Sequence, residues 1–144
     1  AAIDLAVELL ERDPSAVMST LATPIRSREQ LVDPACVKVI FDRRGRAIYF
    51  SRAAIPFARN WDDALLIADP PHFFQHIGLY AYRRAALERF VSLPPSALER
   101  QEKLEQLRAL EAGMRIDIGI VDTVPRGVDT PADLETARQI LAKA

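Results

Sequence analysis

Apolar and polar residues alternate along several short segments of the chain, which is the pattern of half-buried β-strands. The clearest case is 37–52, where two alternating runs flank a turn at Gly45 and predict a β-hairpin. Another alternating segment, 76–82, follows a proline-containing stretch over 55–75 that predicts a long irregular loop. Two further buried strands are expected at 16–21 and 116–121.

Other segments have apolar residues at helical spacing. The longest predicted helix runs from Ser96 to Glu111, with Leu104, Leu107 and Leu110 on its buried side. The remaining helical segments are expected at 1–12, as a single turn at 28–31, and at 83–91 and 131–143.

This order of elements predicts the α/β class, with a mixed sheet and flanking helices in a single partial domain over 1–144. The chain is 49% hydrophobic and 27% charged, as one globular domain should be. Its net charge of −1 argues against a nucleic-acid partner. No apolar run approaches the ~20 residues that cross a bilayer, so we expect no membrane partner and a cytoplasmic location. Cys36 has no cysteine partner in the chain and is expected to be buried.

The first residues indicate that this chain is part of a longer protein. The chain starts Ala1-Ala2-Ile3 without an initiator Met, already inside a predicted helix. It also lacks the Gly-rich phosphate loop that an α/β nucleotide site usually places after its first strand. Either the protein binds no nucleotide, or that part lies outside this chain.

Three hydrogen-bonding rings share one face of the strand predicted at 76–82. They are His76, Tyr80 and Tyr82, and Gly78 between them removes side-chain bulk where a ligand could approach. From periodicity alone, an aromatic sheet face covered by a helix is the favoured interpretation, and a ligand site is the alternative.

Glu102, Glu105 and Gln106 lie away from the leucine stripe of the helix predicted at 96–111. Charges opposite an apolar stripe usually form a solvated face, and the wall of a polar cleft is the alternative.

Asp129 precedes the last predicted helix and is not needed to cap it, because Thr130 can cap and Pro131 suits the first helical position. Its carboxylate either bonds nearby turn amides or holds Mg²⁺ against phosphate oxygens. The pattern does not favour one of these over the other.

Four motifs follow one another along the chain: YFSRAAIP at 49–56, HIGLYAYR at 76–83, LERQEKLEQLR at 98–108 and GVDTP at 127–131. In this order and at this spacing they resemble the 3-deoxy-manno-octulosonate (KDO) cytidylyltransferases, also called CMP-KDO synthetases. The resemblance implies the C-terminal part of a nucleotide-diphospho-sugar transferase fold, which is Rossmann-like. It also implies the reaction CTP + KDO → CMP-KDO + pyrophosphate, which supplies lipopolysaccharide synthesis.

In that family an N-terminal half carries the CTP-binding loop and a further metal-binding Asp. The resemblance therefore implies that this chain is the sugar-binding and dimer-forming portion and is inactive alone. It implies Asp129 as a catalytic residue and Mg²⁺ ligand, and the hairpin with its following loop as a homodimer arm. The positions implied to line the KDO pocket are Arg52, His76, Tyr80, Glu105 and Gln106.

Two other interpretations stay open. The chain could be a non-catalytic sugar-binding or dimerisation module. It could also belong to the sialic-acid cytidylyltransferases, which share the chemistry but match less well at Ser51-Arg52 and at 104–107.

Overall fold

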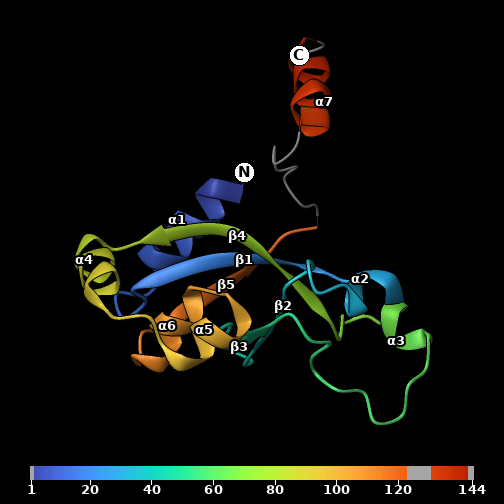
Figure 1. Ribbon diagram of the computed structural model, residues 1–144, viewed down its shortest axis with the longest axis horizontal. Helices are drawn as coiled ribbons and strands as arrows, with labels where there is room; N and C mark the ends of the chain where they lie inside the picture. Colours follow the sequence, from blue (N-terminus) through green and yellow to red (C-terminus); the bar gives the residue numbers. More distant parts are fainter. Residues whose placement is uncertain (1, 123–130, 143–144) are drawn as a thin grey trace.

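A computed structural model describes residues 2–122 and 131–142 of the chain. These residues form a five-stranded sheet with helices on both faces (Figure 1). The strands are β1 (Met18–Pro24), β2 (Lys38–Phe41), β3 (Ala47–Ser51), β4 (Phe74–Tyr82) and β5 (Ile116–Ile120). The helices are α1 (Ala2–Arg12), α2 (Arg28–Val32), α3 (Ala64–Ile67), α4 (Arg84–Ser92), α5 (Ala97–Glu102), α6 (Gln106–Glu111) and α7 (Pro131–Leu141).

The sheet is mixed, as the sequence predicts. Its strand order is β3-β2-β4-β1-β5, with β1 antiparallel to β4 and parallel to β5. The hairpin predicted at 37–52 is confirmed as β2 and β3. Its turn needs Gly45, which has a positive φ of 78° that favours glycine.

Each face of the sheet packs a separate apolar core. Helix α1 covers one face, where Ala6 packs with Leu21 and Ile77. Gly119 gives two leucines room, because a Cβ there would lie 2.9 Å from the Leu21 side chain and 3.0 Å from that of Leu5 of α1, and both would have to shift. Helices α5 and α6 lie on the opposite face (Figure 1), over the larger core. No helix among the described residues is long and apolar enough to span a membrane.

The continuous helix predicted from Ser96 to Glu111 is wrong. Two short helices, α5 and α6, replace it, and Lys103 between them has a left-handed φ of 56°. The break lets the carboxylate of Glu102 reach β3, while Leu104 and Leu107 still enter the core. A tertiary hydrogen-bond partner thus overrides a helical pattern that is locally acceptable.

The loop predicted over 55–75 differs from the structure in two places. It contains the short helix α3, and β4 begins at Phe74, earlier than the predicted start at His76. The last predicted helix is confirmed as α7, whereas Asp129 and Thr130 lie outside the described residues.

Candidate functional site

A row of rings runs along the face of β4 that points toward the larger core, as predicted. The ring centroids of Phe50 and His76 are 4.9 Å apart, and those of His76 and Tyr80 are 5.4 Å apart. The row continues from Tyr80 to Tyr82 at 5.9 Å and ends at Phe90 of α4, 6.0 Å further on. The apolar members fix the positions of three rings that carry hydrogen-bonding atoms.

His76 is held in place by Thr20 of β1. The Thr20 hydroxyl oxygen lies 3.0 Å from His76 Nε2. It also lies within hydrogen-bonding distance of two backbone carbonyl oxygens, those of Ile77 (3.0 Å) and Leu79 (2.7 Å), to which its proton can be donated. Both Thr20 and His76 are buried. The histidine ring therefore has a defined orientation before any ligand binds.

Burial favours the uncharged forms of these polar rings. It lowers the pKa of His76 to about 4, so the imidazole is neutral at neutral pH. Burial also raises the pKa of Tyr80, with further contributions from Tyr82 and from the Glu105 carboxylate. Neutral donors and acceptors of this kind suit a polyhydroxylated ligand.

The low pKa of His76 predicts a pH-dependent stability. The unfolded chain titrates this histidine near pH 6.5 and the folded chain near 4, so the unfolded state binds more protons between those values. The free energy of unfolding should therefore fall by up to about 3 kcal/mol as the pH drops through this window. Urea unfolding of wild type and His76→Gln at several pH values measures this fall. Subtracting the two free energies of unfolding at each pH removes the contributions of the carboxylates, which both proteins share.

His72 supplies the matched control for that experiment, since it is exposed on the loop before β4. His72→Gln should follow the wild-type pH profile. An unchanged profile in His76→Gln would contradict the assignment of a buried neutral imidazole.

Glu105 and Gln106 stand at the start of α6, and the structure separates their roles. Glu105 is exposed, as predicted, and its carboxylate is close enough to raise the pKa values of Tyr80 and Tyr82. Gln106 is only 3% exposed, so the expectation of a solvated position is wrong for it. No described residue forms a hydrogen bond with its side-chain amide. Among the described residues, only Arg46 Nε is a fully buried side-chain polar atom without a hydrogen-bond partner, so the amide atoms of Gln106 are not fully enclosed.

Arg52 follows β3 and binds backbone carbonyls of two other segments. Its guanidinium donates to the carbonyls of Glu102 (2.8 Å), Lys103 (3.3 Å) and Pro34 (3.0 Å). Three of its five N–H groups are used in this way, which leaves one on each terminal nitrogen. The residue is thus held in place and still has two donors for a bound anion.

Glu102 is a residue of this region that the sequence pattern assigned to a solvated face. Its carboxylate accepts hydrogen bonds from the Ser51 hydroxyl at 2.6 Å, the Arg52 amide at 2.9 Å and the Tyr49 hydroxyl at 3.4 Å. Burial raises its pKa, but the bonds from Ser51 and Arg52 outweigh burial and the pKa is lowered overall. Glu102 thus fastens the end of α5, and with it the start of α6, to β3.

Lys38 of β2 was also missed, because strand alternation gives no sign that a lysine is buried. Its side chain is fully buried, and the ammonium donates to the carbonyls of Asp33 (2.8 Å) and Cys36 (2.5 Å). Burial lowers its pKa. Lys38 and Arg52 therefore hold the same turn, from Asp33 to Cys36, in place. Cys36 is buried, as predicted.

Asp129 lies outside the described residues, so its surroundings are not described. Within 2–122 and 131–142, no group of three or more His, Cys, Asp or Glu side chains is arranged to hold a metal ion.

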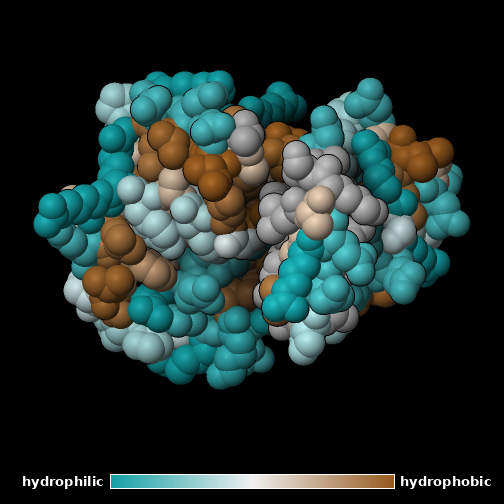
Figure 2. Space-filling view, turned by 90° about the horizontal axis from the view of Figure 1, so that it is seen from above, coloured by the Kyte–Doolittle hydropathy of each residue, from teal (hydrophilic) through white to brown (hydrophobic). Residues whose placement is uncertain are grey.

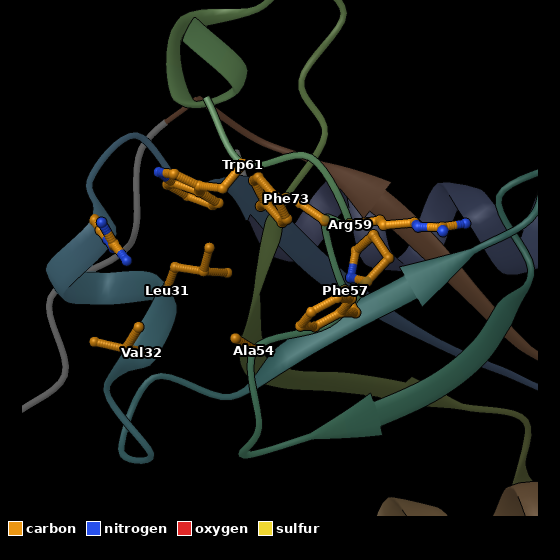
Figure 3. Close-up of a pocket in the computed structure, with 10 residues that line it drawn as sticks. Leu31, Val32, Ala54, Phe57, Arg59, Trp61 and Phe73 are labelled. Carbon is orange, nitrogen blue, oxygen red and sulfur yellow. The ribbon is translucent and has the colours of Figure 1, made fainter. Parts of the chain in front are cut away.

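A separate cavity of about 330 Å³ lies beside α2, away from the ring row. Leu31 and Val32 line it from α2, and Phe57, Trp61 and Phe73 enclose the other sides (Figure 3). Several apolar residues around this end of the molecule are exposed, Phe57 by 86%. In Figure 2, seen from above, apolar surface is visible over the same end.

Comparison with known proteins gives consistent results. The profile of the family described as Cytidylyltransferase matches residues 1–116. The chain is 63% identical to a 3-deoxy-manno-octulosonate cytidylyltransferase of Rhodopseudomonas palustris (strain BisB18), over 90% of this chain and 50% of the relative. It is 62% identical to a protein of the same name from Bradyrhizobium sp. (strain BTAi1 / ATCC BAA-1182), over 92% of this chain and 51% of the relative. The chain thus spans about half the length of these curated relatives.

A solved structure extends this likeness to the fold. It is described as CMP:2-keto-3-deoxy-manno-octonic acid synthetase complexed with CTP. It matches with a TM-score of 0.84 and 38% identity, covering 98% of this chain and 55% of that one.

Proposed function

The chain belongs to the cytidylyltransferase family, and we propose that it is the sugar-acid-binding half of an enzyme that makes CMP-KDO from CTP and KDO for lipopolysaccharide synthesis. The observation that carries the proposal is its likeness, in sequence and fold, to the synthetase whose structure was solved with CTP. The uncharged, buried donors and acceptors along β4 and α6 support a sugar acid as the ligand of this half.

In the proposed reaction, the anomeric hydroxyl oxygen of KDO bonds to the α-phosphorus of CTP. The bond from that phosphorus to the bridging oxygen breaks, pyrophosphate leaves, and the hydroxyl proton passes to solvent. Holding the two anionic reactants in line is the main task of the protein. For KDO we assign this task to Arg52, with its two remaining donors for the carboxylate, and to His76, Tyr80, Glu105 and Gln106 for the hydroxyls.

This half of the enzyme should not react alone, because the resemblance places the CTP-binding loop outside it. The chain by itself should release no pyrophosphate from CTP and KDO, whereas the full-length enzyme should do so with Mg²⁺. Calorimetric titration with KDO distinguishes this enzyme half from a non-catalytic sugar-binding module. Tight KDO binding by a full-length protein that never turns over CTP would favour the module.

We propose Asp129 as a ligand of Mg²⁺, which would neutralise charge on the phosphate oxygens when bound. The resemblance implies a further metal-binding Asp in the N-terminal half of the family, which would supply another ligand. Asp129→Asn in the full-length enzyme should lower kcat by about 100-fold or more, because an amide is a poor substitute for a charged oxygen ligand. KM for KDO should change little.

Asp122→Asn is the matched control, since Asp122 is exposed after β5. Near wild-type turnover in Asp129→Asn, measured by pyrophosphate release at saturating Mg²⁺, would remove the metal role.

We further propose that the apolar surface around the cavity beside α2 is covered by a second copy of the chain. The exposed Phe57 and Val32 line this cavity, and Phe57 belongs to the loop that the resemblance assigns to dimerisation. Phe57→Glu should weaken the dimer by about 100-fold, because it places a charge in an apolar contact that is repeated in both copies. Sedimentation equilibrium measures the dissociation constant. Val91→Glu on α4, which is also exposed, should leave it unchanged; equal effects of both variants would contradict this interface.

A further inference from the structure

The strand pair β1–β4 contains an irregularity beside His76. Thr20 of β1 pairs with Tyr80, but the next residue, Leu21, pairs with Ile77. Gly78 and Leu79 are therefore extra residues on β4, and they form a bulge. The bulge brings the carbonyls of Ile77 and Leu79 to one point, where the Thr20 hydroxyl meets both.

The Thr20 hydroxyl has one proton and three neighbours. Two of these neighbours are carbonyl oxygens, at 2.7 and 3.0 Å, which can only accept a hydrogen bond. The single hydroxyl proton is thus committed to the bulge. The third contact, 3.0 Å to His76 Nε2, must then be donated by the imidazole N–H to the hydroxyl oxygen. Since a neutral imidazole carries one proton, Nδ1 is left with a free lone pair.

We infer that Thr20 is a positioning residue: it fixes His76 as the Nε2–H tautomer, so that Nδ1 accepts a hydrogen bond from a hydroxyl group of the sugar acid. This inference rests on the proposed function for the identity of the ligand. No described residue hydrogen-bonds to Nδ1. A Cβ built on Gly78 of the bulge would meet no atom within 4 Å, so the strand is uncrowded at this point.

Fixing the tautomer has a definite consequence for recognition. In the opposite tautomer Nδ1 would carry a proton in place of its lone pair. The Nδ1–H group and the sugar hydroxyl would then both be donors, and no hydrogen bond could form from the hydroxyl to Nδ1. A site built to accept from a hydroxyl discriminates against ligands that lack it, because its own buried polar atom is then left unpaired.

The tautomer can be observed directly in the full-length enzyme without substrate. Long-range ¹H–¹⁵N correlation spectra of protein labelled with ¹⁵N-histidine distinguish the protonated from the bare ring nitrogen, and His76→Gln identifies the signals of His76. We expect Nε2 protonated and Nδ1 bare, with the Nδ1 signal shifting when KDO is added. A wild-type spectrum with Nδ1 protonated would overturn the inference whatever the activity.

Variants of Thr20 test the effect on the reaction. Thr20→Val keeps the shape but removes the hydroxyl, and it should raise KM for KDO roughly tenfold, the value of one hydrogen bond of about 1.4 kcal/mol, with kcat and KM for CTP little changed. It should also lose the fixed Nε2–H signal. Thr20→Ser, which retains the hydroxyl, should restore both.

Ser19 is the matched control, because it is a neighbouring buried hydroxyl of β1 that donates to the Ala6 carbonyl at 2.6 Å, on the side of α1. Ser19→Ala should lower stability without changing the His76 spectrum or KM for KDO. If Thr20→Val keeps both the tautomer and KM for KDO, the inference is wrong. If the wild-type enzyme makes no CMP-KDO, the proposed function fails, while the substrate-free spectrum still decides whether Thr20 sets the tautomer.

Discussion

Replacing Glu102 by Ala is expected to destabilise the protein by about 2–4 kcal/mol, because hydrogen bonds to a charged acceptor are among the stronger ones and their donors would be left without it. The donors are the Ser51 hydroxyl, the Arg52 amide and the Tyr49 hydroxyl. Denaturant unfolding measures the loss. In the full-length enzyme, KM for KDO should also rise, because the same carboxylate holds β3 against the start of α6.

Gln101→Ala is the matched control for Glu102→Ala, since Gln101 is the preceding residue of α5 and is exposed. It should cost a few tenths of a kcal/mol at most. Glu102→Gln retains one acceptor oxygen and should fall between the two. A loss in Glu102→Ala no larger than in Gln101→Ala would show that the link between α5 and β3 contributes little.

Replacing Gln106 by Leu should change stability and activity in opposite directions. Gln106 is 3% exposed and no described residue hydrogen-bonds to its amide, so a leucine of similar size removes no internal hydrogen bond and should leave stability unchanged or increase it. If the amide binds KDO, kcat/KM for KDO should fall by about 10- to 100-fold. Thermal unfolding and steady-state kinetics on the same samples measure both effects.

Gln101→Leu is the control for a general effect of adding leucine to this region, and its kinetics should match wild type. A Gln106→Leu enzyme that is less stable and equally active would contradict a ligand-binding role. It would indicate that the amide serves the fold.

The strand pattern was sufficient to predict the face that carries His76, Tyr80 and Tyr82. Alternation has a period of two. The bulge on β4 adds two residues, Gly78 and Leu79, and because this number is even the side chains on either side of the bulge keep to the same face. The pattern contains no sign of the bulge itself. The Thr20 contacts that depend on it were therefore beyond prediction.

The errors have a common physical origin. The break at Lys103 accompanies a hydrogen bond from Ser51 of β3 to Glu102, and the buried Lys38 donates to two nearby backbone carbonyls. Periodicity describes which side of an element is apolar, and it cannot indicate that a polar group has found a buried partner.

Periodicity and the resemblance to a known family give different predictions for Gln106. By pattern alone this residue belonged to a solvated face, whereas the LERQEKLEQLR motif implied a ligand pocket. The structure buries Gln106, at 3% exposed, so the pattern was wrong for this residue; its role in a KDO pocket stays a prediction.

We propose that this half selects KDO for reaction with CTP. The most direct measurement is the identification by mass spectrometry of the products that the full-length enzyme forms from CTP with KDO, with sialic acid, or with no sugar acid. We expect CMP-KDO and pyrophosphate in equal amounts with KDO, far less product with sialic acid, and no pyrophosphate without a sugar acid. Absence of CMP-KDO, or a CMP-sugar formed as readily from sialic acid, would contradict this proposal.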